Sequence, residues 1–140
     1  MKATLTTLNT VKVADLISSA IEHYPAAQSN MIRQKIRLEN ITFDDFKKQL
    51  KEAGDKLVVV DFYATWCGPC RLIAPVLEDI SKTSNKVIVL KVDVDENEEL
   101  TSEYGVNSMP TFLFFKKGEK VDSFSGANEN KLRETISKHT

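Results

Sequence analysis

The chain is poor in residues that bind metals or cross-link a fold. Its 140 residues include two cysteines, two histidines and one tryptophan. A structural zinc site needs about four ligands, and the histidines, His23 and His139, lie near the two ends of the chain. A structural disulfide normally closes a long loop, whereas Cys67 and Cys70 have two residues between them. The pair therefore indicates neither a metal site nor a structural bridge.

Other absences narrow the class of protein. The net charge is -1 at pH 7, which gives no electrostatic reason to expect nucleic acid or an acidic membrane as a partner. No apolar run approaches the ~18 residues of a membrane span, and residues 1–30 lack the pattern of a secretory signal. Without structural disulfides the chain fits a reducing compartment, so we expect a cytoplasmic protein.

Residues 1–30 differ in composition from the rest. They are rich in Ser and Thr, and apolar residues fall at helical spacing between positions 13 and 24 before Pro25 interrupts the pattern. We expect residues 1–34 to be an N-terminal extension, flexible or partly helical, and residues 35–140 to be one domain. Deleting residues 1–30 should then leave activity and stability nearly unchanged.

Two alternatives remain for this extension. Residues 1–30 could act as a mitochondrial targeting segment, but such segments are rich in Arg and poor in acidic residues. This one has no Arg before Arg33 and carries Asp15 and Glu22. Met31 could instead be the true start of the protein.

From residue 35 the chain alternates between strand and helix patterns. Strands are expected at residues 35–39, 57–64 and 87–94, each followed by a helix, and a hairpin at 111–115 and 120–124 precedes a closing helix. This order favours an α/β fold with a mixed sheet between helical layers.

Side-chain patterns add detail to the helices. Thr42 and Asp45 occupy capping positions at the start of the first helix, and Asp95 is expected to cap the third. The second helix should kink at Pro75 and bury one apolar side. That side comprises Leu72, Ile73, Val76, Leu77 and Ile80.

Both cysteines lie in the segment WCGPCR, residues 66–71, between an apolar strand and a helix. A Cys-x-x-Cys pair in this position is typical of a redox site, whereas haem attachment would need His in place of Arg71. Two inert buried cysteines are the less favoured alternative. We predict a thiol-disulfide oxidoreductase.

The position of each cysteine suggests its role. Cys67 opens the helix, where free N–H groups and the helix dipole favour a thiolate, so we predict that it is the nucleophile. Cys70, one turn further in and expected to be more buried, would be the resolving cysteine. Gly68 and Pro69 should tune the redox potential, Gly68 by permitting a tight turn and Pro69 by stiffening it.

Asp61 is the one charged residue in the apolar run LVVVDF, residues 57–62. A carboxylate in a central strand is costly unless it is paired or protonated, and a solvated position is the weaker alternative. Buried below the cysteines, Asp61 would have a raised pKa and would accept the proton of Cys70, through water. Lys91 of the next strand would tune Asp61, although a solvated surface position is nearly as plausible for it.

Two further residues lie near the predicted site. Pro110 opens a strand after Met109, a position that proline tolerates, and a cis bond there is uncommon at ~5–6%. Trp66 precedes the reactive turn, where a partly exposed ring would serve as a docking surface.

The chain resembles the thioredoxin family over about residues 35–140. The resemblance rests on several separated segments in the family's order. These are residues 60–70 (VDFYATWCGPC), Pro75, 91–95 (KVDVD), 109–112 (MPTF) and 124–127 (FSGA).

This resemblance implies a thioredoxin fold with a central five-stranded mixed sheet flanked by four helices, and a cis bond before Pro110. It also implies an apolar substrate-binding groove formed by Trp66, Met109, Pro110 and Gly126. Gly126 could equally be a plain turn glycine.

The resemblance implies chemistry without a bound cofactor or metal. The disulfide Cys67–Cys70 would receive electrons from NADPH through a flavoprotein, thioredoxin reductase, and pass them to peroxiredoxins, ribonucleotide reductase and methionine sulfoxide reductases. The extra regulatory cysteines of some animal thioredoxins are absent, so we expect a monomer. Arg71 replaces the usual Lys and keeps its charge.

Two other functions stay open. An oxidase or isomerase of the secretory pathway is disfavoured by Pro69, where that group usually has His. A thioredoxin-fold interaction module would not use its thiols, and the intact pair Cys67 and Cys70 argues against it.

Overall fold

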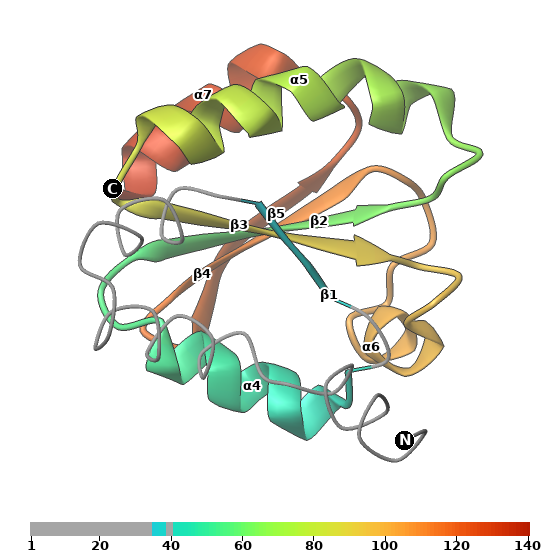
Figure 1. Ribbon diagram of the computed structural model, residues 1–140, viewed down its shortest axis with the longest axis horizontal. Coiled ribbons are helices and arrows are strands. Elements are labelled where there is room, and N and C mark those ends of the chain that lie inside the picture. Colours follow the sequence, from blue (N-terminus) through green and yellow to red (C-terminus); the bar gives the residue numbers. More distant parts are fainter. Residues whose placement is uncertain (1–34, 39–40) are drawn as a thin grey trace, which may run out of the picture.

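The computed structural model describes residues 35–38 and 41–140, and Figure 1 shows the arrangement of their helices and strands. The predicted extension, residues 1–34, lies outside the described residues. Within them, the predicted order of strands and helices is found.

Five strands form one sheet in the order β1-β3-β2-β4-β5. The strands β1, β3 and β2 run parallel, while β4 is antiparallel to β2 and β5 is antiparallel to β4. The predicted mixed sheet of five strands is therefore confirmed. Their bounds are Lys35–Leu38 (β1), Leu57–Tyr63 (β2), Val87–Asp93 (β3), Thr111–Lys116 (β4) and Glu119–Ser125 (β5).

Helices cover both faces of this sheet. Figure 1 shows α5 and α7 on one face and α4 and α6 on the other. The described part of the chain thus has the four helices that were predicted. Their bounds are Phe43–Glu52 (α4), Gly68–Thr83 (α5), Glu98–Glu103 (α6) and Glu129–His139 (α7).

The central strand β2 is buried on both faces because helices cover each of them. Since side chains alternate along a strand, its even-numbered residues pack with α4 and its odd-numbered ones with α5 and α7. Asp61 is odd-numbered, and so its side chain leaves the sheet on the face covered by α5. That helix carries both cysteines.

Two local predictions, one about a helix cap and one about a hairpin turn, are confirmed. The Thr42 hydroxyl accepts a hydrogen bond from the Asp45 backbone N–H at 3.1 Å and caps α4. The hairpin between β4 and β5 turns at Lys117 and Gly118, both with positive φ. A Cβ on Gly118 would lie 2.7 Å from Lys51 Cγ, which is a second reason for glycine there.

Two others are wrong. Leu72 is 78% exposed, because it lies one residue, about 100° around the helix, from Ile73 and outside the buried stripe of α5. Asp95 does not cap α6, which begins at Glu98 with Asn97 in the N-cap position. The Asp95 carboxylate binds the Trp66 side chain instead.

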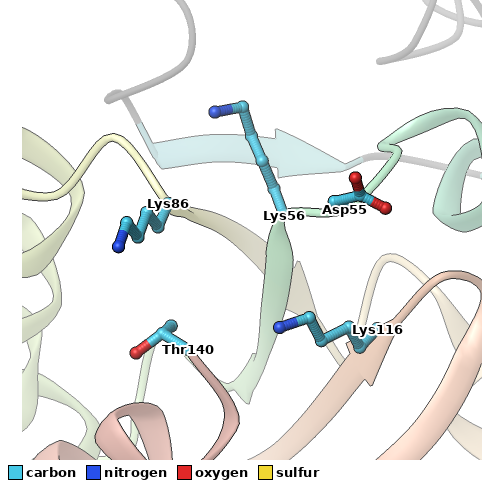
Figure 2. A pocket seen from close by; sticks show the side chains of 5 residues that line it. All are labelled: Asp55, Lys56, Lys86, Lys116 and Thr140. Carbon is cyan, nitrogen blue, oxygen red and sulfur yellow. The ribbon is translucent and has the colours of Figure 1, made fainter.

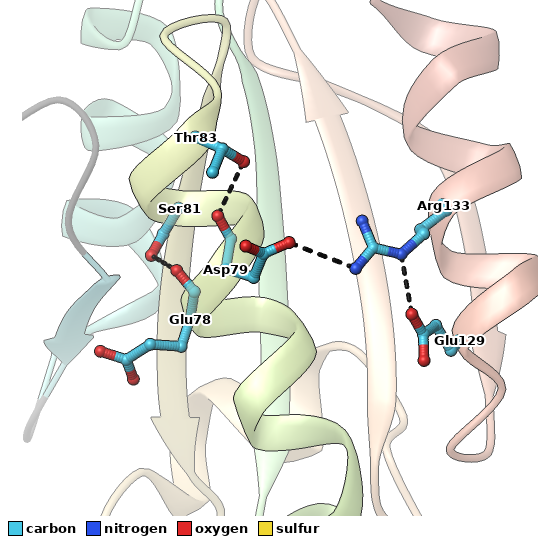
Figure 3. A network of polar contacts seen from close by, with 6 residues as sticks. All are labelled: Glu78, Asp79, Ser81, Thr83, Glu129 and Arg133. Atoms are coloured by element: carbon cyan, nitrogen blue, oxygen red, sulfur yellow. Dashed lines mark hydrogen bonds and ion pairs between the residues drawn. The ribbon is translucent and has the colours of Figure 1, made fainter.

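A surface ion-pair network joins α7 to α5 (Figure 3). Arg133 contacts Glu129 of its own helix at 2.9 Å and Asp79 of α5 at 3.3 Å. The hydrogen bonds to Glu129 and then Asp79 raise the pKa of Arg133 above its ordinary value. All three groups are exposed, so each pair contributes at most about 1 kcal/mol to folding.

Tyr104, just after α6, packs edge-on against aromatic rings of the core. Its ring centroid lies 5.8 Å from that of Phe46 and 5.7 Å from that of Phe115. Burial, followed by the nearby carboxylate of Glu103, raises the pKa of Tyr104 from 10.0 to about 12. The phenol therefore keeps its proton in the folded protein at a pH where the unfolded chain releases it.

Replacing Tyr104 with Phe should make stability less sensitive to alkali. The stabilisation linked to the raised pKa is fully present below pH 10 and is lost as the pH rises towards 12. Urea unfolding in pH steps across this interval should show a steeper loss of unfolding free energy for the wild type than for Tyr104→Phe. Lysine deprotonation affects both proteins alike, so parallel slopes would contradict the role of the phenol.

Candidate active site

The cysteine pair lies where β2 leads into α5. The strand ends at Tyr63, and Cys67 occupies the N-cap position of α5. Cys67 and Cys70 form a disulfide with their Cα atoms 5.3 Å apart. They form a small buried cluster with Ala64, against which Tyr63, Val94 and Met109 pack.

The surroundings of Cys67 favour negative charge on its sulfur. The backbone N–H of Cys70 donates to Cys67 Sγ at 3.2 Å, and the free N–H groups of the first turn of α5 point to the same end. The carbonyl oxygen of Met109 lies 3.6 Å from the sulfur and, as the negative end of a dipole, does not contribute to this effect. Cys67 and Cys70 are 5% and 4% exposed, so the expected deeper burial of Cys70 is not found.

The two residues between the cysteines form the first turn of α5. Pro69 is tolerated there because the first helical N–H groups lack partners within the helix. A Cβ added to Gly68 would meet nothing within 4 Å, and its φ is not positive. The expected steric need for glycine therefore has no basis inside the protein, while the redox-tuning role of both residues stays a prediction.

Among the residues of the predicted groove, Met109 packs against the cluster that contains the disulfide. Trp66 is 64% exposed, and its Nε1–H donates to Asp95 Oδ2 at 3.1 Å. The bond between Met109 and Pro110 is cis, as the resemblance implied. Gly126 has a φ of +105° and donates its N–H to the Pro110 carbonyl at 2.9 Å. Gly126 is therefore a turn glycine and also a neighbour of Pro110.

Asp61 and Lys91 are register partners on the adjacent parallel strands β2 and β3. Their side chains therefore leave the sheet on the same face. Asp61 is 1% exposed, which excludes the solvated alternative, whereas Lys91 is half-buried. The Lys91 ammonium lies 4.2 Å from the centroid of the Tyr63 ring. The proton-accepting role of Asp61 and the tuning role of Lys91 stay predictions.

Sequence reasoning missed three polar residues near the site. Asp95 holds the Trp66 ring, although its place after a strand suggested a helix cap. Thr111 and Ser125 bond to each other through their hydroxyls at 2.8 Å. Thr111 and Ser125 lie inside segments that carry the family resemblance, and nothing in the local pattern distinguishes these two from ordinary strand residues.

A cavity of about 300 Å³ lies at the other end of β2 (Figure 2). Three lysines contribute to its lining, and two of them are already bonded to backbone carbonyls, Lys56 to Asn85 and Lys116 to His139. It lies one strand length, about 20 Å, from the disulfide. The cavity is therefore separate from the candidate active site.

No three His, Cys, Asp or Glu side chains between residue 41 and the last residue are grouped so as to hold a metal ion. In the same part of the chain, no helix is both long and apolar enough to cross a membrane.

The model of the thioredoxin family matches residues 37–138. The chain belongs to the thioredoxin family. Thioredoxin-T of Drosophila melanogaster is 56% identical over 97 residues, which is 69% of this chain and 62% of that protein. Thioredoxin of Ictalurus punctatus is 50% identical over 106 residues, 74% of this chain and 97% of that protein.

Solved structures agree with this assignment. The X-ray structure of Fasciola hepatica thioredoxin aligns with a TM-score of 0.70 and 52% identity, covering 75% of this chain and 99% of that one. The thioredoxin fold is thereby confirmed. Thioredoxins are thiol-disulfide oxidoreductases that bind no cofactor and use a redox-active disulfide, and this chain carries that disulfide at Cys67 and Cys70. It is a protein-disulfide reductase whose partners are thioredoxin reductase and disulfide-bearing proteins.

Proposed function

We propose that Cys67 is the nucleophile and Cys70 the resolving cysteine of this reductase. The main support is the position of Cys67 at the N-cap of α5, where the Cys70 backbone nitrogen lies 3.2 Å from the Cys67 sulfur. These donors favour the Cys67 thiolate once the disulfide is reduced. Cys70 lies one turn further along the helix, where its own N–H is engaged by Cys67.

In this mechanism the electrons and protons balance over two steps. The Cys67 thiolate attacks one sulfur of the target disulfide, forms a mixed disulfide and releases the other target sulfur as a thiolate, which takes up a proton from water. Cys70 then gives up its proton, with Asp61 as the acceptor, and its sulfur attacks Cys67. The second target sulfur leaves as a thiolate and takes up the proton that Asp61 accepted, and the protein is left with the Cys67–Cys70 disulfide that the structure contains.

An NADPH-coupled assay tests the proposed function. We expect the wild type, with a thioredoxin reductase and insulin, to consume NADPH, and a variant with both Cys67→Ser and Cys70→Ser to consume none. An interaction module that does not use its thiols would show no consumption even as wild type. That result would overturn the reductase assignment.

The specific targets are a further part of the proposal. Peroxiredoxins, ribonucleotide reductase and methionine sulfoxide reductases are the expected substrates, because the family resemblance implies them and the exposed ring of Trp66 beside the cysteine pair is accessible to a protein partner. Pull-down with a Cys70→Ser variant, followed by release with a reductant and mass spectrometry, would identify them. If none of the three classes of protein were recovered, this assignment would be contradicted.

We also propose a monomer located in the cytoplasm. Both cysteines belong to the redox pair, so none is left for a disulfide between two copies, and such sparing use of cysteine is typical of a reducing compartment. Sedimentation under oxidising conditions tests the first statement. Fractionation of the native protein tests the second, and recovery with mitochondria would show that residues 1–30 act as a targeting segment.

A further inference from the structure

We propose that Thr111 is a positioning residue for protein substrates, because its hydroxyl fixes the spacing of the two loops that form the groove. One loop contains residues 108–110 and the other residues 125–127. The inference rests on the proposed function, since the groove matters only if protein disulfides bind there.

The Thr111 hydroxyl lies at the centre of a short chain of hydrogen bonds. Thr111 is 8% exposed, and its Oγ1–H donates to the Ser108 carbonyl at 2.6 Å. Its oxygen also lies 2.8 Å from Ser125 Oγ. A hydroxyl has one hydrogen to donate, and that of Thr111 points to Ser108, so Ser125 is the donor in the second bond. The chain runs from Ser125 through Thr111 to Ser108.

A second bond joins the same two loops. The Gly126 N–H donates to the Pro110 carbonyl at 2.9 Å. The carbonyls on both sides of Met109, those of Ser108 and Pro110, are therefore each held by a hydrogen bond. The Met109 carbonyl between them lies 3.6 Å from Cys67 Sγ. The two bonds thus fix the part of the groove that is nearest to the nucleophilic sulfur.

Thr111 acts from the face of the sheet opposite to α5. Along β4, Phe112 and Phe114 pack with α5 and α7, whereas Leu113 and Phe115 pack with α4. By alternation, Thr111 lies on the α4 face, where it lines a cavity of about 170 Å³ together with Tyr104 and Ser125. Its hydroxyl supports the groove from behind, so its role is to position the loop and it takes no part in the sulfur chemistry.

The test compares three variants in the NADPH-coupled assay. Thr111→Val keeps the shape and removes the hydroxyl, Thr111→Ser keeps the hydroxyl, and Thr83→Val removes a hydroxyl that bonds only within α5. Each is assayed with insulin and with a small aromatic disulfide, dithiobis(nitrobenzoate), which does not fill the groove.

For Thr111→Val we expect the KM for insulin to rise about threefold to tenfold, the factor that one net hydrogen bond contributes. Its kcat and its rate with the small disulfide should stay within about twofold of the wild type. Thr111→Ser and Thr83→Val should match the wild type. An unchanged KM for Thr111→Val, or equal losses with both substrates, would overturn the proposal.

A second measurement keeps this inference separate from the proposed function. Exchange of the Gly126 amide hydrogen reports directly on its bond to Pro110. We expect faster exchange in Thr111→Val than in the wild type, and wild-type exchange in Thr111→Ser. Equal exchange in all three would overturn the coupling of the loops. A wild type that fails to reduce insulin would instead refute the reductase assignment, whatever the exchange shows.

Discussion

A Cys70→Ser variant is expected to accumulate as a mixed disulfide with its protein targets, while a Cys67→Ser variant should lose protein-disulfide reduction by about 10³-fold or more. Cys67 caps α5 and receives the Cys70 N–H at 3.2 Å, so its thiolate is the stabilised one. Without Cys70, the mixed disulfide between Cys67 and the target forms, and no second thiol of the protein remains to break it.

Non-reducing gel electrophoresis after incubation with oxidised insulin would measure both results. A mixed-disulfide band should appear with Cys70→Ser, disappear on reduction, and be absent for Cys67→Ser. Because Cys67 and Cys70 are almost equally buried, at 5% and 4% exposed, burial cannot decide their roles. A stable adduct formed by Cys67→Ser would reverse the assignment.

An Asp61→Asn variant should resolve mixed disulfides about tenfold or more slowly near pH 7, as the loss of a general base implies, while its stability stays equal or rises. Asp61 is 1% exposed in the central strand, and a buried carboxylate is costly when ionised. The neutral amide avoids that cost with nearly the same shape. A role in the mechanism is one reason for an acid at this position.

Single-turnover kinetics across pH, together with urea unfolding, would separate these effects. The wild-type rate of resolution should rise with pH as the Asp61 carboxylate loses its proton. This rising limb of the rate–pH profile should vanish in Asp61→Asn. Lys91→Gln is the companion variant, since Lys91 is the register partner of Asp61. Removing its positive charge should move the limb to higher pH. A wild-type rate for Asp61→Asn near pH 7 would exclude Asp61 from the mechanism.

Predictions that depended on local patterns were mostly correct. The Thr42 cap needs a hydroxyl three residues before an N–H, and the hairpin turn needs residues that tolerate positive φ, so both can be read from a few neighbouring residues. The failures came where a local pattern competed with a contact to a residue distant in the sequence. Asp95 fits a helix cap by position, but its carboxylate binds Trp66, which is 29 residues away in the sequence.

The buried apolar side of α5 shows the same limit of reading structure from a local sequence pattern. Helical spacing placed Leu72 with four apolar neighbours, and hydrophobicity alone could not show where the stripe ends. The contacts of the sheet decide this, and they bury Ile73 and leave Leu72 exposed. The nearly equal burial of the two cysteines also follows from packing, because both belong to one cluster with Ala64, against which Met109 packs.

The sequence by itself determined the chemistry and its place in the chain. Two cysteines with two residues between them, at the start of a helix, lie after a strand that contains one acidic residue, and each of these features is local. Tertiary structure decided what surrounds that pair. The carbonyl of Met109 reaches the sulfur of Cys67 across 42 residues of sequence, and the Thr111 hydroxyl meets Ser125 through the antiparallel register of β4 and β5. Such contacts depend on how strands pair and how helices pack on them, and no short stretch of sequence specifies that arrangement.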